Sequence, residues 1–311
     1  MKRLREKARS RLRGASLSLT TPFSTDGNLD ENGFRRNIEF YISNGMRVLM
    51  VGGIYGEVTA LTQEERKRVI RAAVDQSRGR AVVVADTHHV GSLAEAISLT
   101  RYAEETGADY AYILTPYLWR LGDRELFEFY KCIAESVNIG LMLQTNSSRT
   151  NVRLSPEIVQ ELLQFENIVA IKAGEPDMVD LTELIALTGE ELVISCGWEV
   201  HAIQGMILGA QSYYGIVGNF DPVLELKYEA ALMAQDQPLM RKIHFSLSPL
   251  RRLLHGGKMQ TPVVLKAAQE MVGLVGGPVR LPLLPMAEQD RRNLKWVLEQ
   301  ISTGMNEPAR R

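Results

Sequence analysis

The 311-residue chain predicts an α/β fold, a (β/α)8 TIM barrel with a C-terminal helical extension. Apolar strand-like runs alternate with helix-period segments over roughly the first two thirds of the chain, in about eight units of about 25 to 30 residues. Runs such as Ala81–Val84 are apolar throughout, as strands buried on both faces of a parallel sheet are. A doubly wound open sheet is the alternative, but its glycine-rich first turn is absent, because the first turn here is Thr20–Phe23.

The expected strands are short apolar runs. They are Ser16–Leu19, Val48–Val51, Ala81–Ala85, Tyr110–Leu114, Gly140–Leu143, Ile168–Ile171, Leu192–Ser195 and Tyr213–Val217. Helix starts lie between them: Thr62 and Glu65 have the spacing of a capping box, and Ser155 before Pro156 is a typical N-cap. After residue 221 we expect helices only, near 223–235, 238–254, 262–274 and 287–302, with breaks at Gly256–Gly257 and Gly276–Pro278.

We therefore divide the chain into a basic N-terminal extension (1–14), the barrel (15–221) and C-terminal helices packed on the barrel (222–311). The extension carries seven Lys and Arg residues against one acid, Glu6. Leu4, Ala8 and Leu12 recur every four residues, which indicates an amphipathic helix. We interpret it as a solvated or subunit-contacting segment; a transit peptide or an anionic partner is the alternative.

Composition excludes several classes of protein. Lys and Arg total 36 against 37 Asp and Glu, which argues against a nucleic-acid binder. The two cysteines, Cys132 and Cys196, cannot build a disulfide framework or a four-cysteine zinc site, and they fit a reducing cytoplasm. No apolar run approaches the roughly 20 residues of a membrane helix. We expect a cytoplasmic protein with no membrane or nucleic-acid partner.

Reactive residues of such barrels lie at the carboxyl ends of the strands. Lys172 directly follows the apolar run Ile168–Ile171, where burial would lower its pKa and leave a neutral amine. A neutral amine attacks a ketone to form a Schiff base. The alternative is a lysine whose head group simply reaches solvent. His88 and His89 are neighbours on one strand and face opposite ways, and no third ligand is evident, so we expect no metal.

Several landmarks occur in the order and at the spacing of one family. They are Thr21–Phe23, Asp26–Gly27, Gly53–Glu57, Thr115–Tyr117, Ser148–Thr150, Ile171–Lys172 and Leu281–Pro282. Over roughly residues 15 to 300 the chain resembles the dihydrodipicolinate synthase / N-acetylneuraminate lyase family of Schiff-base barrels. The resemblance implies a lyase of a pyruvate-type 2-oxo acid with Lys172 as the covalent residue. It also implies that no cofactor is needed, because the substrate forms an imine with this lysine, and that the chain forms a homo-oligomer, a tetramer or dimer.

The resemblance also suggests the remaining site residues. Catalytic positions are Lys172, Gln144 and Tyr55; substrate-binding positions are Gly53, Ile54, Tyr117, Arg149, Gly197 and Tyr214. Arg149 is the candidate partner of a carboxylate, with a structural ion pair as the alternative. The alternative interpretation of Tyr214 is an aromatic residue packed in the core. Candidate acid–base groups are Tyr55, Tyr117, Tyr214, Glu199 and His88.

Three departures from the family pattern affect the chemistry. Ile54 and Tyr55 replace two threonines, Gln144 replaces the strand-five tyrosine that shuttles protons, and Leu118 replaces a second tyrosine. Glutamine cannot act as an acid or base at ordinary pH. A branch resembling 2-keto-3-deoxy sugar-acid dehydratases also has this glutamine. We therefore favour a dehydratase or aldolase over a true dihydrodipicolinate synthase; the alternative is a non-catalytic small-molecule sensor.

Overall fold

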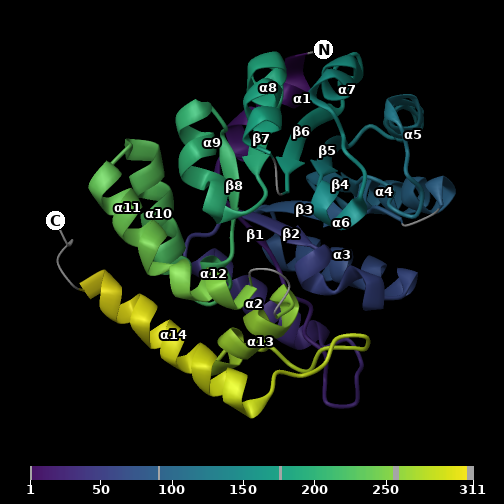
Figure 1. Cartoon of the computed structure of the whole chain (residues 1–311). Coiled ribbons are helices and arrows are strands. Elements are labelled where there is room, and N and C mark those ends of the chain that lie inside the picture. Colours follow the sequence, from purple (N-terminus) through teal and green to yellow (C-terminus); the bar gives the residue numbers. More distant parts are fainter. Residues whose placement is uncertain (1, 90–91, 175–176, 255–258, 307–311) are drawn as a thin grey trace. The chain divides into compact units, whose positions relative to one another are not determined.

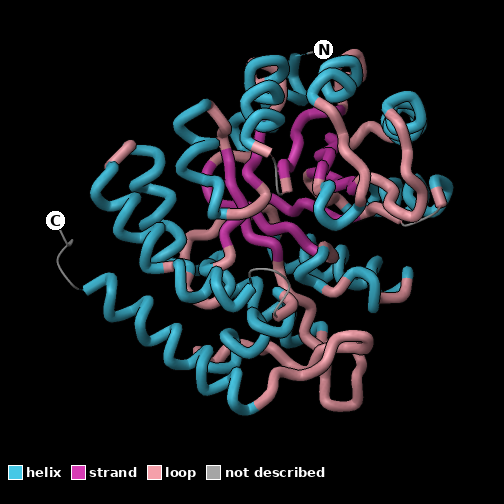
Figure 2. Tube along the Cα trace, viewed as in Figure 1, coloured by secondary structure: helices cyan, strands magenta, loops and turns pink. Residues whose placement is uncertain are grey.

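Eight strands close into one barrel in sequence order in the computed structural model, which describes residues 2–89, 92–174, 177–254 and 259–306 (Figure 2). The strands are β1 (Gly14–Ser18), β2 (Val48–Val51), β3 (Val82–Asp86), β4 (Tyr110–Leu114), β5 (Gly140–Thr145), β6 (Ile168–Ala173), β7 (Val193–Cys196) and β8 (Ser212–Gly215). Neighbours from β3 to β8 pair in parallel. The predicted (β/α)8 barrel is confirmed.

Some strands end at other residues than predicted, because a run of apolar residues does not always coincide with a strand. β5 and β6 each run two residues further than expected, so Gln144 and Lys172 lie within strands. β8 ends at Gly215, two residues early, and Val217–Asn219 is a 3-10 turn, η4. Val217 is buried there although it is not in a strand, which is why an apolar run alone suggested a longer β8.

Helices precede β1 and fill the intervals between the strands. They are α1 (Lys2–Arg11), α2 (Glu31–Ser43), α3 (Gln63–Ser77), α4 (Leu93–Thr106), α5 (Asp123–Ser136), α6 (Ser147–Thr150), α7 (Pro156–Leu162), α8 (Met178–Thr188) and α9 (Ala202–Leu208). The capping box is confirmed: the Glu65 amide donates to Thr62 Oγ1 at 3.2 Å, and the Thr62 amide donates to Glu65 Oε2 at 2.9 Å. Ser155 caps α7 by accepting from the Ile158 amide. Among the described helices, none is long and apolar enough to cross a membrane.

The C-terminal helices are α10 (Pro222–Ala234), α11 (Gln237–Ser246), α12 (Ser248–Leu254), α13 (Thr261–Met271) and α14 (Glu288–Asn306). The helix expected at 238–254 is two helices, since Pro249 in the first turn of α12 has no amide hydrogen to continue the ladder. α14 packs along α11, α12 and α13 (Figure 1). The expected break at Gly256–Gly257 lies outside the described residues.

The chain divides into two compact units whose segments alternate in the sequence. The first contains residues 1–16, 47–50 and 77–215, and the second contains 17–46, 51–76 and 216–311. The division into 1–14, 15–221 and 222–311, which follows sequence order, remains a proposal.

The basic N-terminal segment forms α1, and its apolar face is buried in the first unit. Ala8 and Leu12 are 0% and 1% exposed and belong to one apolar cluster with Val82, Val169 and Val193, residues of the barrel strands. α1 contacts β6 and β7. The predicted amphipathic helix is confirmed, and its apolar face is packed into the core rather than solvated.

Arginines of α1 donate to backbone carbonyl groups of the same unit, two of them near helix ends. Arg5 Nε donates to Ile168 O at 3.1 Å and Arg5 Nη2 donates to Phe165 O at 3.1 Å, just after α7. Arg9 donates to the carbonyl of Gly189, the C-cap of α8, at 2.9 Å. Positive charge is stabilising at helix C-termini. Contacts within this unit therefore account for Arg5 and Arg9, and also for Arg11, which pairs with Asp109.

We predict that Leu12→Ala lowers the free energy of unfolding by about 2–5 kcal/mol, because it opens a cavity in the barrel core. Urea denaturation measures this. The matched control is Leu118→Ala, whose side chain is 66% exposed and whose loss should change stability by less than about 0.5 kcal/mol. Equal effects of the two substitutions would contradict a packed α1.

Candidate active site

The alternation of side chains along β3 carries a carboxylate into the barrel. Val82 and Val84 lie in the apolar core, so Asp86, two residues further on, has the same orientation. Thr87 faces the other way, since its Oγ1 lies 2.7 Å from Oγ1 of Thr100 on α4. Asp86 is only 1% exposed. The barrel interior therefore holds an acidic group at the carboxyl end of β3.

An amide and an amine lie on two further strands of the same unit. Gln144 on β5 and Lys172 on β6 are partners in the strand register. Their side chains are buried, with 1% and 6% of their surface exposed. Both lie near the carboxyl ends of their strands, where reactive groups of such barrels gather.

The Lys172 ammonium group is surrounded by aromatic rings. Nζ lies 4.0 Å from the centre of the Tyr214 ring and 5.7 Å from that of Tyr112. Ring faces attract a cation by their quadrupole. Among the residues that the structure describes, we find no hydrogen-bond acceptor for Nζ. Tyr112, which sequence reasoning missed, and Tyr214 thus form the surface against which the amine rests.

Burial lowers the pKa of Lys172 to about 7, because the apolar barrel disfavours the charged form. The negative charge of Asp86 opposes this effect, and the positive charge of Arg149 adds to it. Near neutral pH a large fraction of the amine therefore carries a free lone pair. This is the property that a Schiff-base nucleophile needs.

Tyr214 contributes its ring rather than its hydroxyl group to this environment. It is 1% exposed and part of the apolar core cluster. Its hydroxyl lies 3.4 Å from Met142 Sδ, and burial raises the pKa of Tyr214 far above the ordinary range for a phenol. A phenol in this position is a poor acid or base. Tyr214 is therefore an aromatic residue of the core, which was the alternative interpretation of the sequence, although its ring faces Lys172.

Asp86 and His88 form a buried pair. Asp86 Oδ1 lies 2.5 Å from His88 Nδ1 and also accepts from the His88 backbone amide at 3.1 Å. His88 is 3% exposed, and its ring centre lies 6.5 Å from that of Tyr117. Sequence reasoning named His88 as an acid–base candidate but missed Asp86. The period-two pattern of Val82 and Val84 is the signal that could have found it.

Gln144 presents a buried acceptor on the strand next to that of Lys172. Within the described part of the chain, its Oε1 has no hydrogen-bond donor although it is shielded from solvent. A buried unsatisfied carbonyl costs about 1–3 kcal/mol. Such an atom is suited to accept a hydrogen bond from a bound molecule.

Tyr117 and Arg149 lie on loops that follow strands. Tyr117 comes after β4 and is half-buried. Arg149 lies on α6, directly after β5, and is exposed, yet its charge reaches Lys172. A guanidinium group there can pair with a carboxylate at the carboxyl end of the barrel.

Gly197 permits the close approach of β6 and β7. Its amide donates to Ala173 O at 2.6 Å. A Cβ atom at Gly197 would lie 2.5 Å from Cα of Gly174, closer than real Cβ contacts allow. The structure thus gives Gly197 a packing role, and its contact with substrate remains a prediction.

Gly53, Ile54 and Tyr55 lie in the second unit. Gly53 is buried, and Ile54 and Tyr55 are half-buried in η1 (Ile54–Gly56). Glu57, which follows, has a left-handed φ of 56°. It lies 2.5 Å from Lys266 Nζ of α13, and the two side chains are 1% and 2% exposed. A buried ion pair therefore holds the end of this loop.

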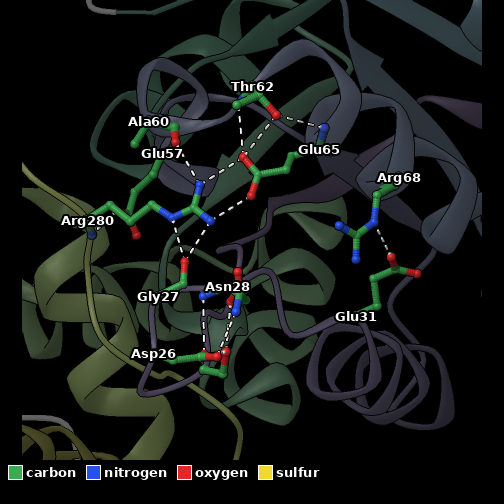
Figure 3. Close-up of polar contacts among 11 residues, drawn as sticks. Asp26, Gly27, Asn28, Glu31, Glu57, Ala60, Thr62, Glu65, Arg68 and Arg280 are labelled. Carbon is green, nitrogen blue, oxygen red and sulfur yellow. Dashed lines mark hydrogen bonds and ion pairs between the residues drawn. The ribbon is translucent and has the colours of Figure 1, made fainter.

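Arg280 holds the same loop from a second direction (Figure 3). Its backbone amide donates to Glu57 Oε2 at 2.9 Å, and its guanidinium donates to Ala60 O at 2.9 Å and to Gly27 O at 2.7 Å. It also pairs with both oxygens of Glu65 and lowers the pKa of that carboxyl to about 2. These contacts give the Asp26–Gly27 and Gly53–Glu57 landmarks a common anchor within the second unit.

No metal centre was expected. Within the described ranges, no group of three or more His, Cys, Asp or Glu side chains could hold a metal ion.

Residues 11–301 match the model of the dihydrodipicolinate synthetase family. The chain is 35% identical over 292 residues to a 4-hydroxy-tetrahydrodipicolinate synthase of Methanothrix thermoacetophila, covering 93% of this chain and 97% of that protein. A protein of the same name from Syntrophobacter fumaroxidans is 34% identical over 288 residues, covering 92% and 97%. The fold and these matches define a lyase-type (β/α)8 barrel. The chain belongs to the dihydrodipicolinate synthetase family.

Solved structures agree with this family assignment. Dihydrodipicolinate synthase from Aquifex aeolicus superimposes with a TM-score of 0.88 at 32% identity, covering 96% of this chain and 100% of that chain. YagE, a prophage protein from E. coli K12 solved in complex with pyruvate, has a TM-score of 0.88 at 27% identity, covering 93% and 98%.

We predict that Arg149→Gln raises the pKa of Lys172, because it removes a positive charge that disfavours the ammonium form. The pH dependence of Lys172 labelling by a small electrophile, followed by peptide mass spectrometry, reports this pKa. The labelling midpoint should move to higher pH. Arg149→Lys keeps the charge and is the matched control; the same displacement in both variants, or a displacement to lower pH, would contradict the assignment.

Proposed function

We propose that this protein is a Schiff-base-forming lyase of a pyruvate-type 2-oxo acid and that Lys172 is its covalent residue. The observation that carries the proposal is the buried amine at the end of β6, with its pKa lowered to about 7. Membership of the family supports it, as do relatives named 4-hydroxy-tetrahydrodipicolinate synthase and a relative solved with pyruvate.

The chemistry follows from the properties of the amine. The neutral Lys172 amine adds to the C2 carbonyl, and the carbinolamine takes up a proton and loses water to leave an iminium ion. The iminium withdraws electrons from the C2–C3 region and stabilises the enamine that forms when C3 loses a proton. The faces of Tyr112 and Tyr214 meet this positive charge, which is attractive for an iminium as for an ammonium.

The reaction that we favour is dehydration or aldol cleavage of a 2-oxo acid longer than pyruvate. Gln144 stands in the strand position beside Lys172, and an amide cannot carry the proton shuttle of the family tyrosine. Its Oε1 is free, among the described residues, to accept from a substrate hydroxyl. Arg149 is the proposed partner of a substrate carboxylate. Tyr55, Gly53 and Ile54 keep their predicted roles in binding and proton transfer as part of the proposal.

The protein needs no external cofactor in this proposal, because the imine is formed from its own lysine. We also propose a cytoplasmic homo-oligomer, a tetramer or dimer. The non-catalytic sensor is not favoured, because a sensor has no need of an amine poised to react.

We predict that pyruvate with borohydride adds one reduced adduct to the wild-type protein, at Lys172, and that Lys172→Ala forms none and loses turnover. Losing the nucleophile removes the electron sink. Intact-mass and peptide mass spectrometry measure the adduct. Lys131→Ala, which removes a lysine on the surface of α5, is the control and should label fully. Labelling of Lys172→Ala at the wild-type level would overturn the assignment.

We predict that 2-keto-3-deoxy sugar acids are converted, with loss of water if the protein is a dehydratase and with release of pyruvate if it is an aldolase. Mass spectrometry of a substrate panel distinguishes the two. Condensation of pyruvate with aspartate semialdehyde should be slow by comparison, because Gln144 cannot shuttle protons. Efficient condensation would show that the departures from the family pattern matter less than proposed, and absence of both products and adduct would favour the sensor.

A further inference from the structure

Enamine formation requires a base for the C3 proton, and the surroundings of Lys172 limit the choice. Gln144 has no basic group at ordinary pH. The Tyr214 hydroxyl lies against Met142 Sδ inside the core. Lys172 itself is consumed in the imine. In the described part of the first unit, the titratable group whose negative charge acts most strongly on Lys172 is Asp86, and Asp86 is bonded to His88.

The Asp86–His88 pair has the geometry of an oriented base. Asp86 Oδ1 faces Nδ1 of His88 at 2.5 Å, so in the neutral imidazole the proton resides on Nδ1 and the lone pair on Nε2. The second bond, from the His88 backbone amide to the same oxygen, fixes the carboxylate relative to the ring. Nε2 lies on the other side of the ring and is directed away from Asp86.

Contact with Asp86 holds this base at the carboxyl end of β3. His88 lies in the loop just beyond β3 (Val82–Asp86), and its ring is held against the inward-facing Asp86, whose charge acts on Lys172. Its ring approaches that of Tyr117, on the loop that follows β4. Both residues of the pair are more than nine-tenths buried. A buried carboxylate also offsets the positive charge of an iminium or imidazolium nearby.

We propose that His88 is the general acid–base of this site and that Asp86 is the residue that positions it. The inference rests on the proposed Schiff-base function. From the iminium, His88 Nε2 takes a proton from C3; the C–H electrons form the C2–C3 double bond, and the C–N π electrons return to nitrogen. The imidazolium then gives its proton to the hydroxyl leaving C4, which departs as water as the C3–C4 double bond forms. Asp86 stabilises the imidazolium between the two transfers.

The test separates imine formation from proton transfer by using pyruvate alone as the probe. In heavy water, reversible enamine formation replaces the C3 hydrogens of pyruvate by deuterium, which NMR follows, while borohydride trapping reports the imine on Lys172. His88→Asn keeps a donor at the Nδ1 position and removes Nε2. His88→Gln also removes the imidazole but has a longer side chain. Asp86→Asn removes the charge that positions the ring.

We expect both His88 variants to form the borohydride adduct at the wild-type level and to lose exchange by about a hundredfold or more. Asp86→Asn should also keep the adduct and lose exchange, because the imidazole is no longer held in one tautomer. His89→Gln is the matched control: the neighbouring imidazole accepts at 3.0 Å from the amide of Ser92, the N-cap of α4, and its loss should leave exchange unchanged.

Adduct yield verifies that each variant is folded and competent, and two His88 variants guard against failure of one to fold. Wild-type exchange in both His88 variants overturns the inference and leaves the proposed function standing. A wild-type protein that forms the adduct without exchange overturns it as well. A wild-type protein that forms no adduct overturns the proposed function together with this inference.

Discussion

Desolvation of charged groups inside the closed barrel is the constraint on which the site depends. Strand residues alternate between the interior and the surrounding helices, so a polar residue with inward parity is forced out of water. Lys172 is in that position, and burial lowers its pKa to about 7. Asp86 enters from β3 by the same alternation, and its charge partly compensates that of the lysine. The reactivity of the Lys172 amine is therefore a consequence of its buried position inside the barrel.

A second buried lysine, Lys266, differs from Lys172 because a carboxylate and a carbonyl group bind its ammonium group. Lys266 of α13 lies 2.5 Å from Glu57, donates to Pro278 O at 2.7 Å and lies over the ring of Phe23. Burial lowers the pKa of Lys266 as well, but Glu57 opposes this effect by direct contact. Glu57 and the Pro278 carbonyl hold the ammonium group, which anchors the end of the Gly53–Glu57 loop. Lys172 has no such acceptor among the described residues, so its amine is available for chemistry.

The N-terminal helix illustrates how charge composition alone can mislead. Seven basic residues in the first thirteen suggested solvent, a targeting signal or an anionic partner. Arg5 and Arg9 instead donate to carbonyls at the ends of α7 and α8, while Ala8 and Leu12 enter the apolar core. Their counterparts lie within the same unit: carbonyls near the negative ends of α7 and α8, and the carboxylates of Glu191 and Asp109, which pair with Arg5 and Arg11. Periodicity of the apolar residues was the more informative signal.

From the sequence it was possible to predict the barrel, seven of the eight strand starts to within one residue, the capping box at Thr62 and the candidate nucleophile Lys172. These features are local: apolar runs, cap spacing and a lysine at the end of a strand-forming segment. The folded structure was needed to show that Tyr214 turns its ring to Lys172 and its hydroxyl to the core, that Gly197 permits the approach to Gly174, and that Asp86 contacts His88. Those facts depend on strand register and side-chain rotamers across the barrel, which bring together residues far apart in the sequence.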